Sequence, residues 1–114
     1  MPFLMIKTNL DLEKTNIQAL LNHASRVVAE TIQKPESYVM VNVCANEHMI
    51  FAGTTLPTVY MEMKSVDLTK KQIPVLSATL TQMIEQRLKV PGNRVYIEFA
   101  SVPGILWGYN GATF

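Results

Sequence analysis

Apolar and polar positions follow the same pattern in two stretches of this chain, residues 3–44 and 59–100, which align without gaps after a shift of 56 residues. Each stretch has a short apolar run, an Asp-Leu step, a long amphipathic segment, a proline and a second apolar run. The identical positions are Met5/Met61, Asp11/Asp67, Leu12/Leu68, Lys14/Lys70, Ile17/Ile73, Leu20/Leu76, Pro35/Pro91 and Val39/Val95. The shared pattern predicts an internal repeat in which each copy forms the same elements.

The amphipathic segments have the spacing of helices that bury one face. Their apolar positions are Ile17, Leu20, Leu21, Ala24, Val27, Val28 and Ile32 in the first copy, and Ile73, Leu76, Leu80, Met83, Ile84 and Leu88 in the second. We expect Asp11 and Asp67 to be caps or pre-caps of the helices, because a carboxylate accepts hydrogen bonds from the free amides at a helix start. Thr69 and Gln72 have the spacing of a capping box.

Strands are predicted after Pro35 and Pro91, which oppose continuation of the helices. Residues 39–44 and 95–100 alternate, so that one face of each strand is apolar and should meet the helices. Each copy is therefore predicted to be a β-α-β unit. Two copies give an α/β (α+β) fold, a four-stranded mixed sheet with two helices on one face. We expect a single domain over residues 1–114, with pseudo-repeats at 2–50 and 58–103 and a C-terminal arm at 104–114.

The opposite face of this sheet is predicted to be only half polar. It carries Met40, Cys44, Tyr60 and Tyr96 beside Asn42, Glu62 and Glu98. Because large exposed apolar patches usually mark an interface, we expect an oligomer. The arm has a turn signal and two large aromatic residues, Trp107 and Tyr109, which predicts a short strand or arm that packs on a neighbouring subunit.

The composition argues against nucleic-acid binding, disulfide bonding and membrane insertion. Apolar residues make up 48% of the 114 residues, and the net charge of +1 without a basic run gives no reason to expect nucleic-acid binding. The single cysteine, Cys44, excludes an internal disulfide and fits a reducing compartment. No stretch approaches the ~20 apolar residues that span a bilayer, and polar residues 7–9 come too early for a signal peptide. We expect a cytoplasmic protein without a membrane partner; leaderless secretion stays open.

Pro2 carries the strongest chemical signal. Removal of Met1 would expose its secondary amine, a base that no internal residue supplies. An α-amino group titrates near ~7.7–8.0, and an apolar pocket or a nearby cation lowers that pKa, which suits general acid–base catalysis. The alternative is that proline stands here by chance, since it makes up ~5% of residues. His23 and His48 lack partners at metal-ligand spacing, so no metal site is expected.

Pro2, the two β-α-β copies and the ending Gly-Tyr-Asn-Gly-Ala-Thr-Phe together resemble the macrophage migration inhibitory factor (MIF) family of the tautomerase superfamily, over essentially the whole chain. Further segments that look like the family's are Thr8-Asn9, Lys34-Pro35, Tyr38, Arg94-Val95-Tyr96-Ile97, Asn110 and Thr113-Phe114. The resemblance implies a homotrimer whose sheets surround a central channel. It also implies keto–enol tautomerisation of phenylpyruvate-like acids and dopachrome-type compounds without metal or organic cofactor.

The resemblance also assigns residues. Pro2 is the catalytic base, Lys34 matches a lysine that holds the substrate carboxylate, and Tyr96 matches a tyrosine from the neighbouring subunit. The segment Ser65 and Val66 contacts substrate through its backbone, and the pocket wall falls on Tyr38, Trp107, Tyr109 and Phe114. A base, a cation and a hydroxyl donor suffice for the reaction. Without the resemblance, Lys34 would be read as a solvated cation at a helix end, and the aromatic residues as packing.

Two departures from the family pattern change the expected chemistry. Thr58-Val59-Tyr60-Met61 replaces a Cys-x-x-Cys, so thiol redox activity, which needs two thiols, is expected to be absent. Glu98 stands beside the pocket where many members have asparagine. A carboxylate there repels an anionic substrate and raises the Pro2 pKa. We hypothesise that Glu98 weakens phenylpyruvate turnover or redirects the enzyme to another substrate; an unchanged or lower kcat/KM in Glu98→Asn would count against this.

Two other functions remain open at this point. A secreted cytokine mimic would bind a receptor through its trimer surface, and that binding would survive loss of the Pro2 chemistry. The acidic and arginine pattern linked to receptor recognition is not evident, since Leu12 and Ala45 lie in those regions. A non-catalytic trimer would show no turnover and would tolerate Pro2→Gly, Lys34→Ala and Tyr96→Phe.

Overall fold

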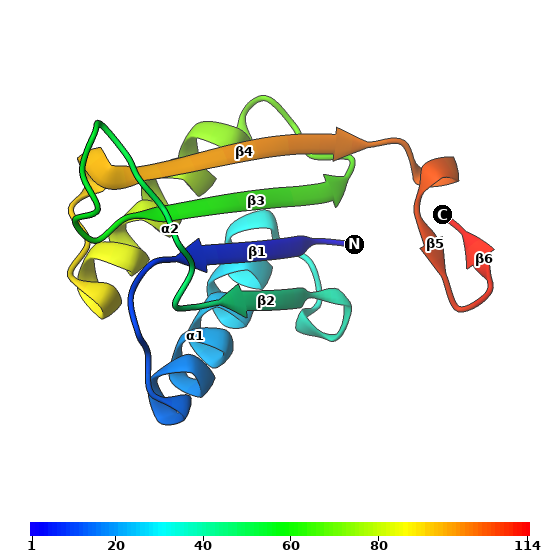
Figure 1. Ribbon diagram of the computed structural model, residues 1–114. Helices are drawn as coiled ribbons and strands as arrows, with labels where there is room; N and C mark the ends of the chain where they lie inside the picture. The colour runs from blue at the N-terminus through cyan, green and yellow to red at the C-terminus, as the bar shows by residue number, and fades with distance from the viewer.

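The computed structural model describes residues 1–114 and contains a sheet, two long helices and a small C-terminal hairpin (Figure 1). In chain order the elements are β1 (Phe3–Thr8), α1 (Lys14–Ile32), the 3₁₀ helix η1 (Glu36–Tyr38), β2 (Met40–Cys44), β3 (Val59–Val66), α2 (Gln72–Leu88), the 3₁₀ helix η2 (Gly92–Arg94), β4 (Val95–Val102), the 3₁₀ helix η3 (Gly104–Leu106), β5 (Gly108–Tyr109) and β6 (Ala112–Thr113). The predicted helices and strands are all present.

The sheet has the strand order β2-β1-β3-β4. The pairs β1–β2 and β3–β4 are parallel, whereas β1 and β3 are antiparallel. The crossover helices α1 and α2 lie on the same face of the sheet (Figure 1). This arrangement confirms the predicted fold class. Because β1 and β3 run in opposite directions, equivalent positions of the two β-α-β units lie at opposite ends of the sheet.

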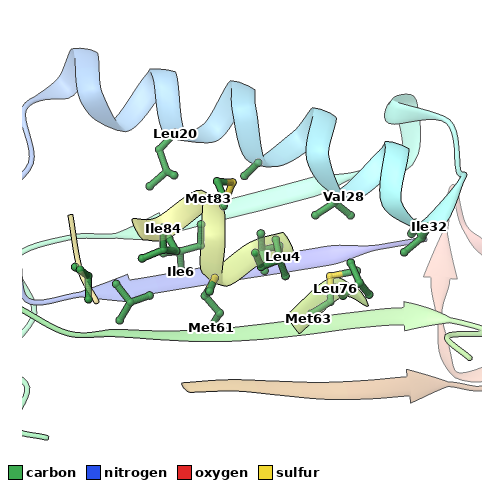
Figure 2. Packing of buried hydrophobic residues seen from close by; sticks show 14 of the residues in the cluster. Leu4, Ile6, Leu20, Val28, Ile32, Met61, Met63, Leu76, Met83 and Ile84 are labelled. Atoms are coloured by element: carbon green, nitrogen blue, oxygen red, sulfur yellow. The ribbon is translucent and has the colours of Figure 1, made fainter. Parts of the chain in front are cut away.

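The hydrophobic core fills the space between the helices and the sheet. Figure 2 shows Leu20, Val28 and Ile32 of α1 directed toward the strands. The fully buried large apolar residues are Leu4, Ile6, Leu20, Val28, Val59, Met61, Met63, Leu76, Leu80, Ile84 and Val90. Burial of each such side chain contributes roughly 1.5–3 kcal/mol. The core thus fixes the sheet, whose ends carry the candidate site residues.

Both long helices end with the same local conformation. Gln33 and Lys89, 56 positions apart, are left-handed, with φ of 55° and 59°. Each donates its backbone N–H to the carbonyl four residues earlier. Pro35 and Pro91 then precede η1 and η2. The repeat that the sequence predicts is therefore present in the backbone, down to single residues at the helix ends.

The prediction for the helix starts was half right. Thr69 and Gln72 form the capping box: the Gln72 N–H donates to Thr69 Oγ1 at 3.2 Å, and the Thr69 N–H donates to Gln72 Oε1 at 2.9 Å. Asp11 and Asp67 both lie before their helices, but neither forms the cap hydrogen bond that was expected as one alternative. Helix α1 starts after Glu13 without a side-chain cap, so Asp11 lies too far upstream. Asp67 has a left-handed φ of 56° directly after β3, and Thr69 caps the second helix instead.

The face opposite the helices is open in the single chain. Met40 and Tyr96 on this face expose 65% and 64% of their surface, in agreement with the predicted half-polar face. The C-terminal arm leaves the sheet after β4 and folds back as the β5–β6 hairpin (Figure 1). Asn110 and Gly111, both at positive φ, form its turn, as an Asn-Gly pair favours. Neither helix has the length and apolarity that crossing a membrane requires.

Candidate active site

Pro2 lies at the end of the sheet where β1 and β2 begin and β3 ends. It is buried, and its carbonyl oxygen accepts a hydrogen bond from the Met40 N–H at 3.0 Å. The next residue, Phe3, pairs with Met40 of β2 and with Lys64 of β3. This pairing on both sides holds the start of the chain in a fixed position. With Met1 attached, the Pro2 nitrogen is an amide and is not basic.

Two adjoining cavities open beside this end of the sheet. The first, here the Lys34 cavity, has a volume of about 530 Å³, and its wall includes Met1, Lys34, Tyr38, Val66, Asp67 and Phe114. The second, here the Pro2 cavity, has a volume of about 360 Å³, and its wall includes Met1, Pro2, Tyr38, Met40, Trp107 and Tyr109. Met1 and Tyr38 line both cavities, so the chain start lies between them. These volumes suit a small organic ligand.

The aromatic wall is built by the arm and η1. Tyr38 has its ring centroid 5.6 Å from that of Tyr109 and 6.5 Å from that of Phe114, both edge to face. Tyr109 and Phe114 stack at 5.5 Å. A Cβ atom on Gly104 would lie 2.8 Å from the Phe114 carbonyl oxygen, so only glycine allows this close return of the chain. The arm therefore packs on its own chain at the cavity; packing on a neighbour stays a prediction.

Lys34 brings the positive charge. It follows the left-handed end of α1, and its backbone N–H donates to the Ala29 carbonyl at 3.0 Å, which directs the chain from the helix into the cavity wall. Burial lowers the pKa of the Met1 amine below its usual 8.0, the Lys34 ammonium lowers it further, and the Asp67 carboxylate acts in the opposite direction. An amine at this place is therefore a better neutral base than an exposed one.

Three predicted site residues, Ser65, Tyr96 and Glu98, lie outside both cavities. The Ser65 side chain is buried and donates from Oγ to the Val66 carbonyl at 3.2 Å, while Val66 itself lines the Lys34 cavity. Tyr96 pairs with Tyr60, which pairs with Lys7. Lys7 is five residues from Pro2, or roughly 16 Å at ~3.3 Å per residue. Tyr96 and Pro2 of one chain are therefore at opposite ends of the sheet.

Glu98 lies near the middle of the open face. It pairs with Glu62 of β3, which accepts a hydrogen bond from Tyr60 Oη at 3.1 Å and forms a salt bridge with Lys64 at 3.6 Å. Burial and the hydrogen bond to Glu62 raise the pKa of Tyr60, and the Glu98 charge acts in the same direction. Glu98 thus belongs to an acidic strip of the open face and does not line either cavity of its own chain.

The end of the sheet that carries Tyr96 is held by Arg94. Its guanidinium donates to the carbonyl oxygens of Pro57, Phe51, Thr54 and Leu56, at 2.9, 3.1, 3.3 and 3.1 Å. The same group lies 5.2 Å from the centroid of the Phe51 ring, which in turn contacts Tyr96 edge to face at 4.8 Å. Arg94 thereby fixes the loop between β2 and β3 and, through Phe51, the position of Tyr96.

The roles of two residues, Asp67 and Arg94, were not predicted from the sequence. Asp67 was expected to be a helix cap or pre-cap, yet it lines the Lys34 cavity. Arg94 was noted only as part of a family segment, although it organises a whole loop. The repeat gives no signal for either role, because Asp67 aligns with Asp11, which lines a separate cavity, and Arg94 aligns with Tyr38. No three His, Cys, Asp or Glu side chains gather as a metal site would require.

The repeated β-α-β architecture is that of the tautomerase superfamily. The crystal structure of the MIF homologue from Prochlorococcus marinus matches with a TM-score of 0.92 and 37% identity, covering 98% of each chain. The MIF structure from Trichinella spiralis matches with a TM-score of 0.89 and 29% identity, covering 98% of this chain and 99% of that one.

The chain belongs to the macrophage migration inhibitory factor (MIF) family, whose sequence profile matches residues 1–114. The MIF homologue of Brugia malayi is 35% identical over 115 residues, which cover 100% of this chain and 99% of the relative. The family includes tautomerases and proteins with cytokine-like roles. Membership supports isomerase activity in general, without specifying the substrate.

Proposed function

We propose that this protein is a cofactor-independent keto–enol tautomerase that acts on phenylpyruvate-like acids, and on dopachrome-type compounds, with Pro2 as the catalytic base. The observation that carries the proposal is the position of Pro2: it is held at the end of the sheet, in the wall of one cavity, with Lys34 in the wall of the adjoining one. Once Met1 is removed, the secondary amine of Pro2 faces this space.

The environment of the chain start suits a neutral base. The causes that lower the pKa of the amine at Met1, burial first and the Lys34 charge second, act on any amine at this end of β1. The Lys34 ammonium is also free to bind the substrate carboxylate, because it has no salt bridge of its own. The aromatic and apolar wall of Tyr38, Trp107 and Tyr109 suits a phenyl ring.

In this reaction the neutral Pro2 amine takes a proton from the carbon between the ketone and the ring of phenylpyruvate. The electron pair of that C–H bond forms the C=C bond, and the ketone oxygen takes up the negative charge. A hydroxyl donor stabilises this charge, and the oxygen gains a proton to give the enol. The protonated Pro2 amine then loses its proton to solvent. No electrons enter or leave, so the reaction needs no redox cofactor.

Tyr96 supplies the hydroxyl only if subunits assemble. Within one chain it is about 16 Å along the sheet from Pro2, and it exposes 64% of its surface on the open face. The proposal therefore includes a homotrimer in which Tyr96 of one subunit approaches Pro2 of the next. In such an assembly Glu98, two residues after Tyr96 on the same face, also nears the site and there lowers the affinity for an anion.

The test is phenylpyruvate tautomerisation by three forms of the protein whose N-termini are checked by mass spectrometry: free Pro2, Pro2→Gly, and a form that retains Met1. General-base catalysis contributes about 10²–10⁴-fold. We expect kcat/KM to fall by that order when the amine is replaced or blocked, with the fold and the oligomeric state unchanged.

Equal activity in all three forms would rule out Pro2 as the base. Equal inactivity would reject the proposed substrate, and other enolisable acids would be tried next. If no acid reacts, the trimer has a non-catalytic role, and receptor binding by the Pro2→Gly form distinguishes a cytokine-like function.

A further inference from the structure

Asp67 directly follows the last residue of β3 and lies in the wall of the Lys34 cavity. The last residue of the strand, Val66, lines the cavity, and Asp67 beside it also lines it. Asp67 has a φ of 56°, a left-handed conformation that aspartate and asparagine tolerate better than most residues. The backbone thus turns sharply at this residue and leaves its carboxylate in the cavity wall and not on the helix that follows.

The charges of Asp67 and Lys34 face the same space without pairing. The one salt bridge of the chain joins Lys64 to Glu62, and no side-chain hydrogen bond involves Asp67. The two charges also act in opposite directions on the amine at the chain start. The cavity therefore has a positive side and a negative side, each free to act on a ligand.

We propose that Asp67 determines which acids this site accepts, favouring keto acids with one negative charge over keto acids with two. The inference rests on the proposed function, because it assumes that Lys34 binds a substrate carboxylate. With one carboxylate on Lys34, a second carboxylate of a small acid lies in the same cavity as Asp67 and is repelled by it. A phenyl ring in place of the second carboxylate meets no such repulsion.

Asp67 also shapes the turn, and the test separates this role from its charge. Asp67→Asn keeps a residue that tolerates the left-handed conformation and removes only the charge. The repeat supplies a matched control in Asp11→Asn, because Asp11 occupies the equivalent position in the first copy and lines a separate cavity with Leu12 and Arg87. Both variants change the net charge of the protein by the same amount.

The experiment measures KM and kcat for phenylpyruvate, with one carboxylate, and for oxaloacetate, with two, in the wild-type protein and both variants. Exposed charge pairs change affinities by about two- to fivefold. We expect Asp67→Asn to lower KM for oxaloacetate by about fivefold and for phenylpyruvate by about twofold or less. The difference should shrink in high salt, which screens charges. Asp11→Asn should match the wild-type protein.

The inference would be overturned if Asp67→Asn changed KM equally for the two acids, did not change it, or changed it by an amount independent of salt concentration. Each of these results would leave the tautomerase proposal intact. If the wild-type protein turns over neither acid, the proposed function fails. Calorimetric dissociation constants for the same two acids then decide the inference: the preference for the singly charged acid must fall in Asp67→Asn. Absence of binding to both acids overturns both proposals.

Discussion

The two β-α-β units have the same backbone conformation where their helices end, but they carry different side chains directly after it. After the left-handed helix ends at Gln33 and Lys89, the first unit presents Lys34 and Tyr38, and the second presents Val90 and Arg94. Lys34 and Tyr38 line open cavities. Val90 is completely buried, and the Arg94 guanidinium binds four carbonyl oxygens of the loop between β2 and β3.

This difference shows how equivalent positions of a duplicated scaffold come to carry different residues. In the second unit Arg94 donates to four carbonyl groups of the loop, and for the Pro57 carbonyl it is the only protein donor, a bond that water would otherwise have to make. In the first unit the corresponding end is enclosed only by the C-terminal arm, through aromatic contacts with Tyr38. The repeat creates two equivalent positions; Tyr38 at the first lines both cavities, whereas Arg94 at the second holds a loop.

The largest effect is expected when Lys34 of the first unit is replaced by valine, the residue at the equivalent position 90 of the second unit. In Lys34→Val the cavity keeps its walls but loses its cation. Hydrogen bonds to charged groups contribute about 1.5–3 kcal/mol, so we expect kcat/KM for phenylpyruvate to fall about 10- to 100-fold, mainly through KM. Steady-state kinetics measures this, and the melting temperature should change little because Lys34 is exposed.

Lys14→Val is the matched control, because it removes one positive charge at the start of α1, at the other end of the helix. Lys34→Arg should recover part of the lost affinity, since it restores the charge. An equal rise of KM in Lys14→Val would mean that the overall charge, and not a contact with Lys34, attracts the acid.

The second prediction removes the residue that holds the loop at the other end. Arg94→Ala leaves the Pro57 carbonyl without a donor and removes one of the two donors to the carbonyls of Phe51, Thr54 and Leu56. We expect the free energy of unfolding to fall by about 2–3 kcal/mol. Tyr38→Ala, at the equivalent position, removes aromatic pairs that contribute about 0.5–1.5 kcal/mol each from a side chain that is 39% exposed. It should therefore cost less, about 1 kcal/mol.

Urea unfolding of both variants measures the two costs, and limited proteolysis locates them. Cleavage should begin in residues 45–57 in Arg94→Ala and in residues 104–114 in Tyr38→Ala. If Tyr38→Ala were the more destabilised variant, the arm would hold the molecule together more strongly than the loop, and the comparison of a closed end with an open one would be reversed.

Most of the fold could be predicted from the sequence because its signals are local or repeated. The helical spacing, the alternation after Pro35 and Pro91 and the capping box of Thr69 and Gln72 each depend on residues close together in the chain. The repeat then supplied the topology. The cap hydrogen bonds of Asp11 and Asp67 do not form because several residues separate each aspartate from its helix, and the backbone conformation of that connection is not visible in the pattern.

The site was predictable only in part, for a physical reason. Pro2, Lys34, Tyr38 and the arm residues come together because each lies at an element end, and such ends follow from the topology. The role of Arg94 could not be predicted, since its partners are backbone carbonyl groups 37 to 43 residues earlier, and a carbonyl leaves no trace in the sequence. Asp67 reaches the cavity through one left-handed φ angle, which the sequence alone does not reveal.

The smallest effect is expected where the two units touch through their helices. Arg87 of α2 donates from Nε to Nδ1 of His23 on α1 at 2.6 Å, a bond that requires Nδ1 to be unprotonated. Burial lowers the His23 pKa, and the charges of Arg87 and Arg26 lower it further, against an opposite effect of Glu30. The folded protein thus favours neutral His23. The resulting stability is present above the unfolded pKa near 6.5 and is lost as the pH falls through the lower folded value.

We therefore expect the urea midpoint of the wild-type protein to fall slightly more between pH 7.5 and pH 5 than that of His23→Asn, which cannot titrate. The difference is small because this contact is largely open to solvent, where water and salt weaken charge interactions. Arg87→Gln should reduce the wild-type pH dependence in the same direction, since it removes one of the charges that lower the His23 pKa. An identical pH dependence in all three proteins would show that the contact between His23 and Arg87 makes no measurable contribution to the pH dependence of stability.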